Sequence, residues 1–186
     1  MKMGFAICGS FCSHPQVLRI YEDLAARHEL IPILSDSAAR CDTRFGTAEQ
    51  LVGRVERLAG RRALRSIVEA EPLGPSRAMD VLVVAPCTGN TLAKLAAGIS
   101  DNAVTMAAKA QLRNGGPVVC AIATNDGLAG SAPNIARLLG RKHYYFVPFG
   151  QDDPQAKPTS LVADFSLIEA TAEAALEGRQ LQPILR

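Results

Sequence analysis

The sequence lacks a strong excess of either charge and lacks any long apolar run. Twenty basic side chains nearly balance 18 acidic ones, for a net charge of +2. This balance gives no reason to expect nucleic acid or an anionic membrane as a partner. No segment approaches the roughly 18 consecutive apolar residues of a membrane-spanning helix. The apolar start of the chain could suggest a secretion signal, but Gly9 and Ser10 interrupt it too early.

Cysteine and histidine are too few and too scattered for the common metal and nucleophile patterns. The five cysteines include no C-x-x-C pair and have no zinc-like spacing to the three histidines. Reduced thiols in the cytoplasm are the simplest account. No metal site is expected, and the catalytic acid or base stays unknown from the spacing. His14 is the one histidine placed to meet a ligand, and a structural role is the alternative.

Short apolar runs alternate with helical patterns along the whole chain. We expect strands at 5–8, 30–34, 81–85, 117–123 and 143–148. We expect helices at 15–28, 48–58, 63–70, 92–99, 103–113, 134–139 and 161–176, and a turn-rich connector at 71–75. The alternation predicts an α/β fold with a three-layer, doubly wound parallel sheet of the flavodoxin-like, Rossmann type. We expect one domain over residues 1–186, closed by a C-terminal helix at about 160–177 that packs on the sheet.

The stretch from Asp80 to Asn102 carries most of the functional signal. It reads DVLVVAPCTGNTLAKLAAGISDN, which is a buried strand, a polar turn and then a helix. Open α/β sheets bind ligands at such places, at the carboxyl ends of their strands. The turn offers hydroxyl, amide and helix N–H groups but no obvious acid or base. This favours holding a polar cofactor over unaided chemistry.

Small polar clusters follow several of the predicted strands, and a parallel sheet brings these strand ends to one edge. The candidate cofactor-binding residues are Gly9, Ser10, Ser35, Pro86, Cys87, Thr88, Asn90, Thr91, Thr124 and Asn125. Glycine followed by a hydroxyl before a helix N-terminus suits a phosphate, although such a pair alone is also an ordinary turn. The dinucleotide motif G-x-G-x-x-G and the Walker pattern are absent. A mononucleotide such as FMN therefore fits better than NAD or ATP.

Three side chains near these clusters have two interpretations each. Cys87 could be a thiolate nucleophile at a helix N-terminus, or a small residue that packs against the ligand. Lys94 could reach over the polar turn, or it could be a solvated helix lysine. Arg44, in a loop after the second strand, could clamp a carboxylate with two hydrogen bonds, or it could be an ordinary surface arginine.

The same residues resemble the FMN-binding flavoproteins that include the cysteine decarboxylases and the prenyl-flavin synthases. The resemblance lies in residues 85–91 (APCTGNT) and 93–102 (AKLAAGISDN), with Gly9 and Ser10 similar to the family's phosphate-binding turn. One branch is more similar still, through residues 42–46 (DTRFG), 69–75 (EAEPLGP), 104–110 (VTMAAKA), 124–128 (TNDGL) and 145–154 (YFVPFGQDDP). The chain departs from the decarboxylases, because it has no tryptophan and lacks both their P-x-M-N-x-x-M-W segment and their catalytic histidine.

The resemblance implies FMN as cofactor and the oxidation of a small dicarboxylate to an aromatic product. In that branch the flavoprotein acts with a separate nicotinamide-binding partner chain, and it forms trimer-based homo-oligomers. A dianionic product would need cations near the flavin, and Arg44, Lys94 and Lys109 are the substrate-binding candidates. A flavin-dependent decarboxylase or prenyltransferase of the same fold is an alternative. A non-catalytic subunit that stabilises its partner is another.

Overall fold

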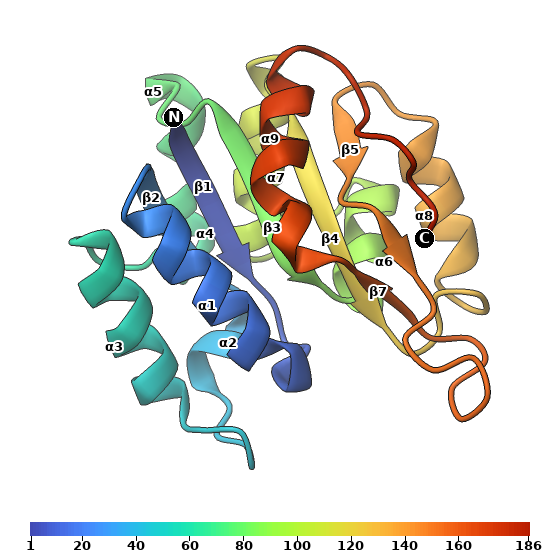
Figure 1. The fold of residues 1–186 in the computed structure, drawn as a ribbon. Coiled ribbons are helices and arrows are strands. Elements are labelled where there is room, and N and C mark those ends of the chain that lie inside the picture. Colours follow the sequence, from blue (N-terminus) through green and yellow to red (C-terminus); the bar gives the residue numbers. More distant parts are fainter.

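A parallel sheet of five strands forms the centre of the fold (Figure 1). The computed structural model describes residues 1–186. The strands are β1 (Lys2–Ile7), β2 (Glu29–Leu34), β3 (Val81–Cys87), β4 (Val118–Thr124) and β5 (Tyr144–Phe146). They lie in the order β2-β1-β3-β4-β5, and each pair is parallel. This order is that of flavodoxin-like sheets, so the predicted fold class is confirmed.

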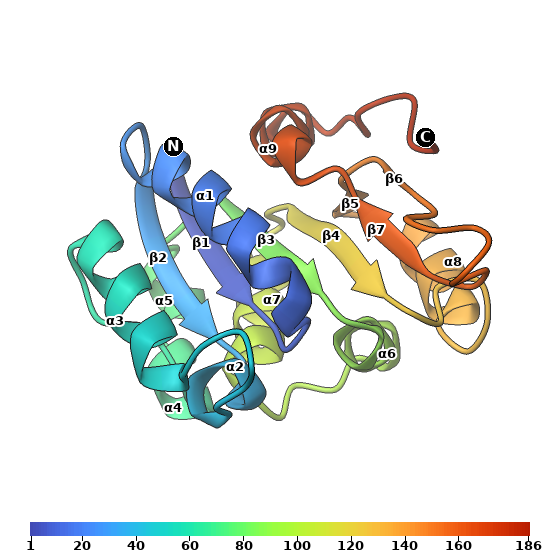
Figure 2. The same ribbon diagram turned by 60° about the horizontal axis from the view of Figure 1, so that its bottom comes forward.

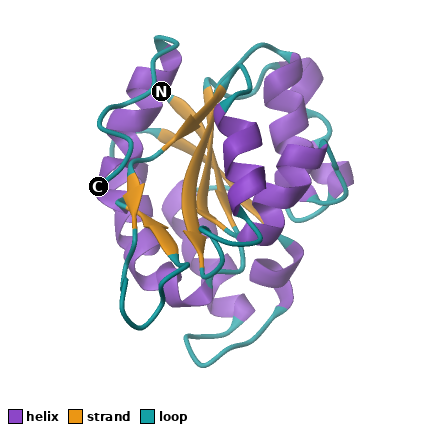
Figure 3. Cartoon of the chain, turned by 90° about the vertical axis from the view of Figure 1, so that its right-hand side faces the viewer, coloured by secondary structure: helices purple, strands orange, loops and turns teal.

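Helices cover both faces of this sheet, which gives three layers (Figure 3). On one face lie α1 (His14–Ala25), which follows the short helix η1 (Phe11–Ser13), and α9 (Ile168–Leu176). The other face carries α7 (Ala103–Arg113), with α4 (Ile67–Ala70), α5 (Leu73–Ser76) and α6 (Gly89–Ala97) beside it. At the two ends, α3 (Ala48–Ala59) packs against β2 and α1, and α8 (Ala132–Leu139) packs against β5 and α6. None of these helices is both long and apolar enough to cross a membrane.

The helix α7 packs against the sheet through small side chains. Ala103, Ala107, Ala108 and Ala110 are all buried, and the helix contacts β1, β2, β3 and β4. Alanine removes little side-chain entropy in a helix and allows a close approach to the strands. Asn102 caps the helix through its side-chain oxygen, which accepts a hydrogen bond from the N–H of Thr105 at 3.1 Å. The predicted helix at 103–113 is confirmed.

The C-terminal part of the chain differs from the sequence prediction. Residues 161–163 form a strand, β7 (Leu161–Ala163), that pairs antiparallel with the end of β4 and with β6 (Phe149–Gly150). Because β5 covers only the first half of β4, the second half has free backbone groups, and β7 satisfies them. The helix α9 begins only at Ile168, after the short helix η2 (Phe165–Leu167). The expected helix at 161–176 was therefore wrong over its first turns.

The segment before β3 also differs from the prediction. The expected helix at 63–70 is reduced to α4, because Leu64 runs beside β2 as an isolated parallel bridge with Ile33. The N–H of Leu64 donates to Pro32 O, and Leu64 O accepts from the N–H of Leu34, both at 2.9 Å. The expected connector at 71–75 folds into the short helix α5. Both changes come from contacts between distant segments, which local periodicity does not record.

Candidate functional site

Three strand ends meet at the carboxyl edge of the sheet and enclose a polar cavity of about 310 Å³. Figure 2 looks toward this edge, where the helix α2 (Asp36–Arg40) follows β2, and α6 follows β3. We call it the polar cavity. Ten residues line it: Cys8, Gly9, Ser35, Asp36, Ser37, Thr88, Asn90, Thr91, Lys94 and Asn102. Six of them, Gly9, Ser35, Thr88, Asn90, Thr91 and Lys94, are among the predicted site residues.

The loop after β1 contributes Gly9 to the polar cavity. A side chain at this position would place its Cβ 3.2 Å from the Cβ of Ser37 and 3.6 Å from the ring of Phe11. The loop is held by backbone hydrogen bonds of 3.0 Å from the N–H of Ser10 to Cys8 O and from the N–H of Ser13 to Ser10 O. The hydroxyls of Ser10 and Ser13 lie 3.2 Å apart, and the side chain of Ser10 does not line the cavity. A side chain at this position would therefore need Ser37 to shift by a few tenths of an ångström.

Ser35 fixes the second strand end. Its N–H donates to Ile7 O at 3.0 Å, which joins the ends of β1 and β2. Its hydroxyl oxygen accepts from the N–H of Ala38 at 3.3 Å and caps α2. The neighbouring Asp36 and Ser37 also line the cavity. Sequence reasoning left them out, although they follow the same strand end.

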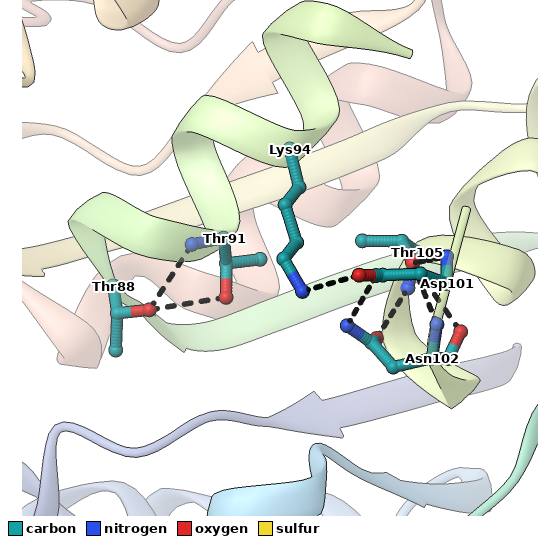
Figure 4. Close-up of polar contacts among 6 residues, drawn as sticks. All are labelled: Thr88, Thr91, Lys94, Asp101, Asn102 and Thr105. Carbon is teal, nitrogen blue, oxygen red and sulfur yellow. Dashed lines mark hydrogen bonds and ion pairs between the residues drawn. The ribbon is translucent and has the colours of Figure 1, made fainter. Parts of the chain in front are cut away.

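The N-terminus of α6 forms the third wall, with Thr88 as its cap (Figure 4). The Thr88 hydroxyl oxygen accepts from the N–H of Thr91 at 3.2 Å, and the two threonine hydroxyls lie 3.0 Å apart. The N–H groups of Gly89 and Asn90, in the first helical turn, have no carbonyl four residues earlier to pair with inside the helix. They carry the partial positive charge of the helix N-terminus. This wall therefore offers both hydroxyls and N–H donors to an anion.

Lys94 is the one cation that lines the polar cavity. Its Nζ lies 2.7 Å from Asp101 Oδ2 (Figure 4). The hydrogen bond from Lys94 lowers the pKa of the Asp101 carboxyl. The other Asp101 oxygen accepts from the side-chain amide of Asn102 at 3.0 Å. Asn102, the last residue of the family-like segment 93–102, also lines the cavity, although it was not among the predicted cofactor-binding residues.

Pro86 and Cys87 are buried and do not line the cavity. Cys87 is fully buried, and its pKa is raised well above the usual range, first by a hydrogen bond with Cys120 and then by burial. Cys8 does line the cavity, but burial raises its pKa to about 12. A raised pKa keeps a thiol protonated at neutral pH. The geometry thus favours the packing role of Cys87 over the role of nucleophile.

Thr124 is the last residue of β4 and Asn125 follows it, and neither lines the polar cavity. The Thr124 hydroxyl donates to Asp126 Oδ1 at 2.6 Å, and the Ser131 hydroxyl donates to the same oxygen at 2.8 Å. A Cβ on Gly89 would lie 2.7 Å from Thr124 Oγ1. Thr124 therefore touches the first residue of α6, while Asn125 is exposed.

The remaining candidates lie away from the polar cavity. Arg44 is exposed and stacks over the ring of Phe45, 4.9 Å from its centroid. Lys109 lines a separate cavity of about 180 Å³ beside α7. His14 is buried, with Nε2 2.8 Å from Cys8 O, and burial lowers its pKa. The structure therefore brings Lys94 together with the predicted cofactor residues, but neither Arg44 nor Lys109.

Comparisons with known proteins show the family and the fold of the chain. A family model described as "Flavoprotein" matches residues 1–134. The B subunit of dipicolinate synthase from Bacillus subtilis (strain 168) is 45% identical over 185 residues, covering 99% of this chain and 92% of that protein. The crystal structure of the same type of subunit from Bacillus halodurans C superposes with a TM-score of 0.91 at 42% identity, over 100% of this chain and 95% of that one.

A more distant structure shares the fold. Burkholderia xenovorans DmrB, described as a cubic protein cage for redox transfer and solved in complex with FMN, gives a TM-score of 0.70 at 19% identity, over 95% of each chain. The branch resemblance carried by residues 42–46, 69–75, 104–110, 124–128 and 145–154 is confirmed by the two dipicolinate synthase chains.

Proposed function

The chain belongs to the flavoprotein family, and from this premise we propose that it is the flavoprotein subunit of a dipicolinate synthase. In this function it binds FMN and oxidises dihydrodipicolinate to dipicolinate (pyridine-2,6-dicarboxylate) during sporulation. It works together with the A subunit of the synthase, which binds a nicotinamide. The observation that carries the proposal is the likeness to the B subunit of dipicolinate synthase across nearly the whole chain.

The groups of the polar cavity fit the phosphate and the polyol chain of FMN. A phosphate needs N–H, hydroxyl or cationic partners, and the cavity offers the first-turn N–H groups of α6, the Thr88 and Thr91 hydroxyls and Lys94. Gly9 allows the backbone to come close to an anion. Asn90 and Asn102 add amides that can both donate and accept. When bound, FMN would supply a two-electron acceptor for the oxidation.

The chain's own residues would bind and orient the cofactor. Ser35 and Thr88 already cap α2 and α6, so their hydroxyl oxygens are fixed before any ligand arrives. Lys94 provides a positive charge next to the α6 N-terminus. Such preorganised donors lose little freedom on binding. Ser10, Pro86, Cys87, Thr124 and Asn125 would serve as the surrounding support of this site.

We also propose the wider setting of the protein. The described residues share one hydrophobic cluster of 52 buried residues, which supports one domain over residues 1–186. All five cysteines are free thiols, as is usual in the cytoplasm. A trimer-based homo-oligomer and a complex with the nicotinamide-binding partner would complete the assembly. We expect no nucleic acid and no membrane among its partners.

The first test is an absorption spectrum of the purified chain before and after FMN addition and desalting. We expect flavin bands to survive desalting. Asn90→Ala should weaken FMN binding by about 1 kcal/mol, the net worth of one hydrogen bond, in a fluorescence titration. Asn134→Ala, on α8 and away from the polar cavity, is the matched control. Equal affinity in both variants would remove this cavity from the assignment.

The second test separates the proposed reaction from its alternatives. The chain and its nicotinamide-binding partner are mixed with dihydrodipicolinate, and dipicolinate formation is followed by absorbance. We expect oxidation that needs both proteins and flavin. A rate that is the same with flavin-free chain would instead favour a non-catalytic stabilising role. Release of carbon dioxide from a peptidyl cysteine would favour the decarboxylase alternative.

A further inference from the structure

A second cavity, of about 330 Å³, lies between α1, α2, α3 and the loop at residues 41–47. We call it the aromatic cavity. The side chains that matter for its chemistry are Phe11, His14, Cys41, Phe45 and Arg54. Its volume is within the range of small-molecule sites. Nothing in the proposed cofactor role uses it.

Aromatic rings form two of its walls. The rings of Phe11 and His14 pack edge to face with centroids 5.2 Å apart. Phe45 is 45% exposed although it is a large apolar side chain. Two contacts hold the loop that carries Phe45. Thr43 and Gly46 form an isolated antiparallel β-bridge, and the N–H of Ala48 donates to Asp42 Oδ1 at 2.9 Å. Such walls suit a small planar ring, since aromatic pairs gain energy beyond their buried area.

Arg54 is the one arginine or lysine in the lining of the aromatic cavity. No aspartate or glutamate is among its lining residues. Arg54 lies in the wall and forms an ion pair with the exposed Glu22, in which Nη2 is 3.0 Å from Oε2. Arg44 stacks on Phe45 and makes no ion pair within 4.0 Å with any carboxylate. One guanidinium group in the wall, and a second stacked on a lining ring, favour a ligand ring that carries carboxylates, which arginine binds through paired hydrogen bonds.

The aromatic cavity adjoins the polar cavity. Gly9 lines the polar cavity, yet a Cβ built on it would lie 3.6 Å from the ring of Phe11, which lines the aromatic one. The helix α2 separates them elsewhere, with Ser37 facing the polar cavity and Ala38 the aromatic cavity. Gly9 and Phe11 therefore form a shared boundary between the two cavities.

We infer that the aromatic cavity is the site for the ring dicarboxylate, with Arg54 and Arg44 as its carboxylate partners and Phe11 and Phe45 as its ring contacts. This inference rests on the proposed function for the identity of the acid. It makes Arg44 a substrate residue through its position above Phe45. It also leaves Lys109 out of that role, because Lys109 lines a different cavity.

Cys41 provides a direct test, because it is an exposed free thiol in the lining of the aromatic cavity. The native chain is treated with iodoacetamide at increasing concentrations of pyridine-2,6-dicarboxylate, without FMN, and alkylation is measured peptide by peptide by mass spectrometry. We expect the Cys41 rate to fall about tenfold when the acid reaches about ten times its Kd. Cys12, exposed but outside this lining, should keep its rate.

Two variants on the same helix complete the test. Arg54→Gln should abolish most of the protection of Cys41. Arg57→Gln removes the same charge one turn further along α3 and outside the cavity, so it should retain the protection. Unchanged Cys41 reactivity in the wild-type chain would overturn the inference, as would equal protection in both variants.

The experiments distinguish a failure of this inference from a failure of the proposed function. A chain that makes dipicolinate with its nicotinamide-binding partner but shows no protection of Cys41 would keep the function and lose this site. A chain that shows Arg54-dependent protection but retains no FMN and oxidises nothing would keep the site and lose the flavoenzyme role.

Discussion

Lys94, the one cation of the polar cavity, is held by a carboxylate that lies outside the cavity wall. Its Nζ is 2.7 Å from Asp101 Oδ2, and Asp101 stands in the loop between α6 and α7. The side chain of Lys94 is 26% exposed and that of Asp101 is 50% exposed. The pair fixes the direction of the ammonium group, while water screens the carboxylate. An incoming phosphate would thus meet a positioned charge.

Removing this charge should weaken the binding of FMN more than that of riboflavin, which has no phosphate. We expect Lys94→Met to raise the Kd for FMN about five- to tenfold, since a partly screened charge-assisted hydrogen bond is worth about 1 kcal/mol. The riboflavin Kd should stay unchanged, as judged by flavin fluorescence. Lys109→Met is the control, because it removes the same charge from a different cavity. A similar loss of FMN affinity in both variants would show that Lys94 acts only through long-range attraction of the phosphate.

Asp126 should stabilise the fold in a pH-dependent way. Hydrogen bonds from Thr124 and then Ser131 lower the pKa of its carboxyl, against the effect of burial. Because the folded pKa is lowered, the stabilisation is present above the ordinary carboxyl pKa and is lost as the pH falls through the folded value. We expect Asp126→Ala to lower the free energy of unfolding by about 1–2 kcal/mol at pH 7, since Ser131 is buried and loses its acceptor.

The measurement for Asp126 is urea unfolding of the wild type and the variant at several pH values. The difference between them should shrink as the pH falls below about 4, because the carboxyl of the unfolded chain then takes up a proton before that of the folded protein does. A difference that stays constant between about pH 7 and about pH 3 would show that the charge of Asp126 contributes nothing. Asp23→Ala, at an exposed position of α1, serves as the control for loss of a surface carboxylate.

Two glycine substitutions should act in opposite directions. A Cβ on Gly89 would lie 2.5 Å from Ser131 Oγ and 2.7 Å from Thr124 Oγ1, so Gly89→Ala must push β4 and the α6 N-terminus apart. We expect it to lower the melting temperature and weaken FMN binding together. Gly53 lies inside α3, where a Cβ would meet only the flexible end of Arg57 at 3.3 Å. Gly53→Ala should therefore stabilise the protein by roughly 0.5–1 kcal/mol. A stabilising Gly89→Ala would contradict the close packing.

The strand and helix pattern was readable from the sequence wherever local signals agreed. The apolar run at 81–85 and the helical spacing at 103–113 both predicted their elements. The pairing of β7 with β4 was not readable, because Leu161–Ala163 has a helix-compatible composition and its partner lies far away in the chain. Long-range pairing overrode local propensity there.

The candidate site was likewise only partly predictable from the sequence. The rule that the ends of parallel strands converge predicted that Gly9, Ser35 and Thr88 lie together, and all three line the polar cavity. It did not reveal that Cys87 points into the core, since a strand residue's face depends on its register. Nor could it locate Arg44, because a loop position follows from packing rather than from periodicity.

The cysteines offer a final prediction about the wall of the polar cavity. Cys12 and Cys41 are exposed, while Cys8, Cys87 and Cys120 are buried. Burial raises the pKa of Cys8 to about 12, so almost no thiolate forms there even in mildly alkaline buffer. We expect a thiol titration with a disulfide reagent to detect two of the five cysteines in the native protein, and all five in denaturant.

Changing the pH from about 7 to about 9 should speed the reaction of the two exposed thiols without recruiting a third, because the thiolate is the reactive form. The Cys12→Ser and Cys41→Ser variants should each lose one fast thiol. Cys8 is the informative exception, since it lines the polar cavity while being only 1% exposed. A third thiol that reacts in the native protein, and that FMN protects, would show that the cavity opens further in solution than its walls indicate. If no third thiol reacts, the polar cavity stays closed to the reagent at Cys8, and Cys8 acts by packing alone.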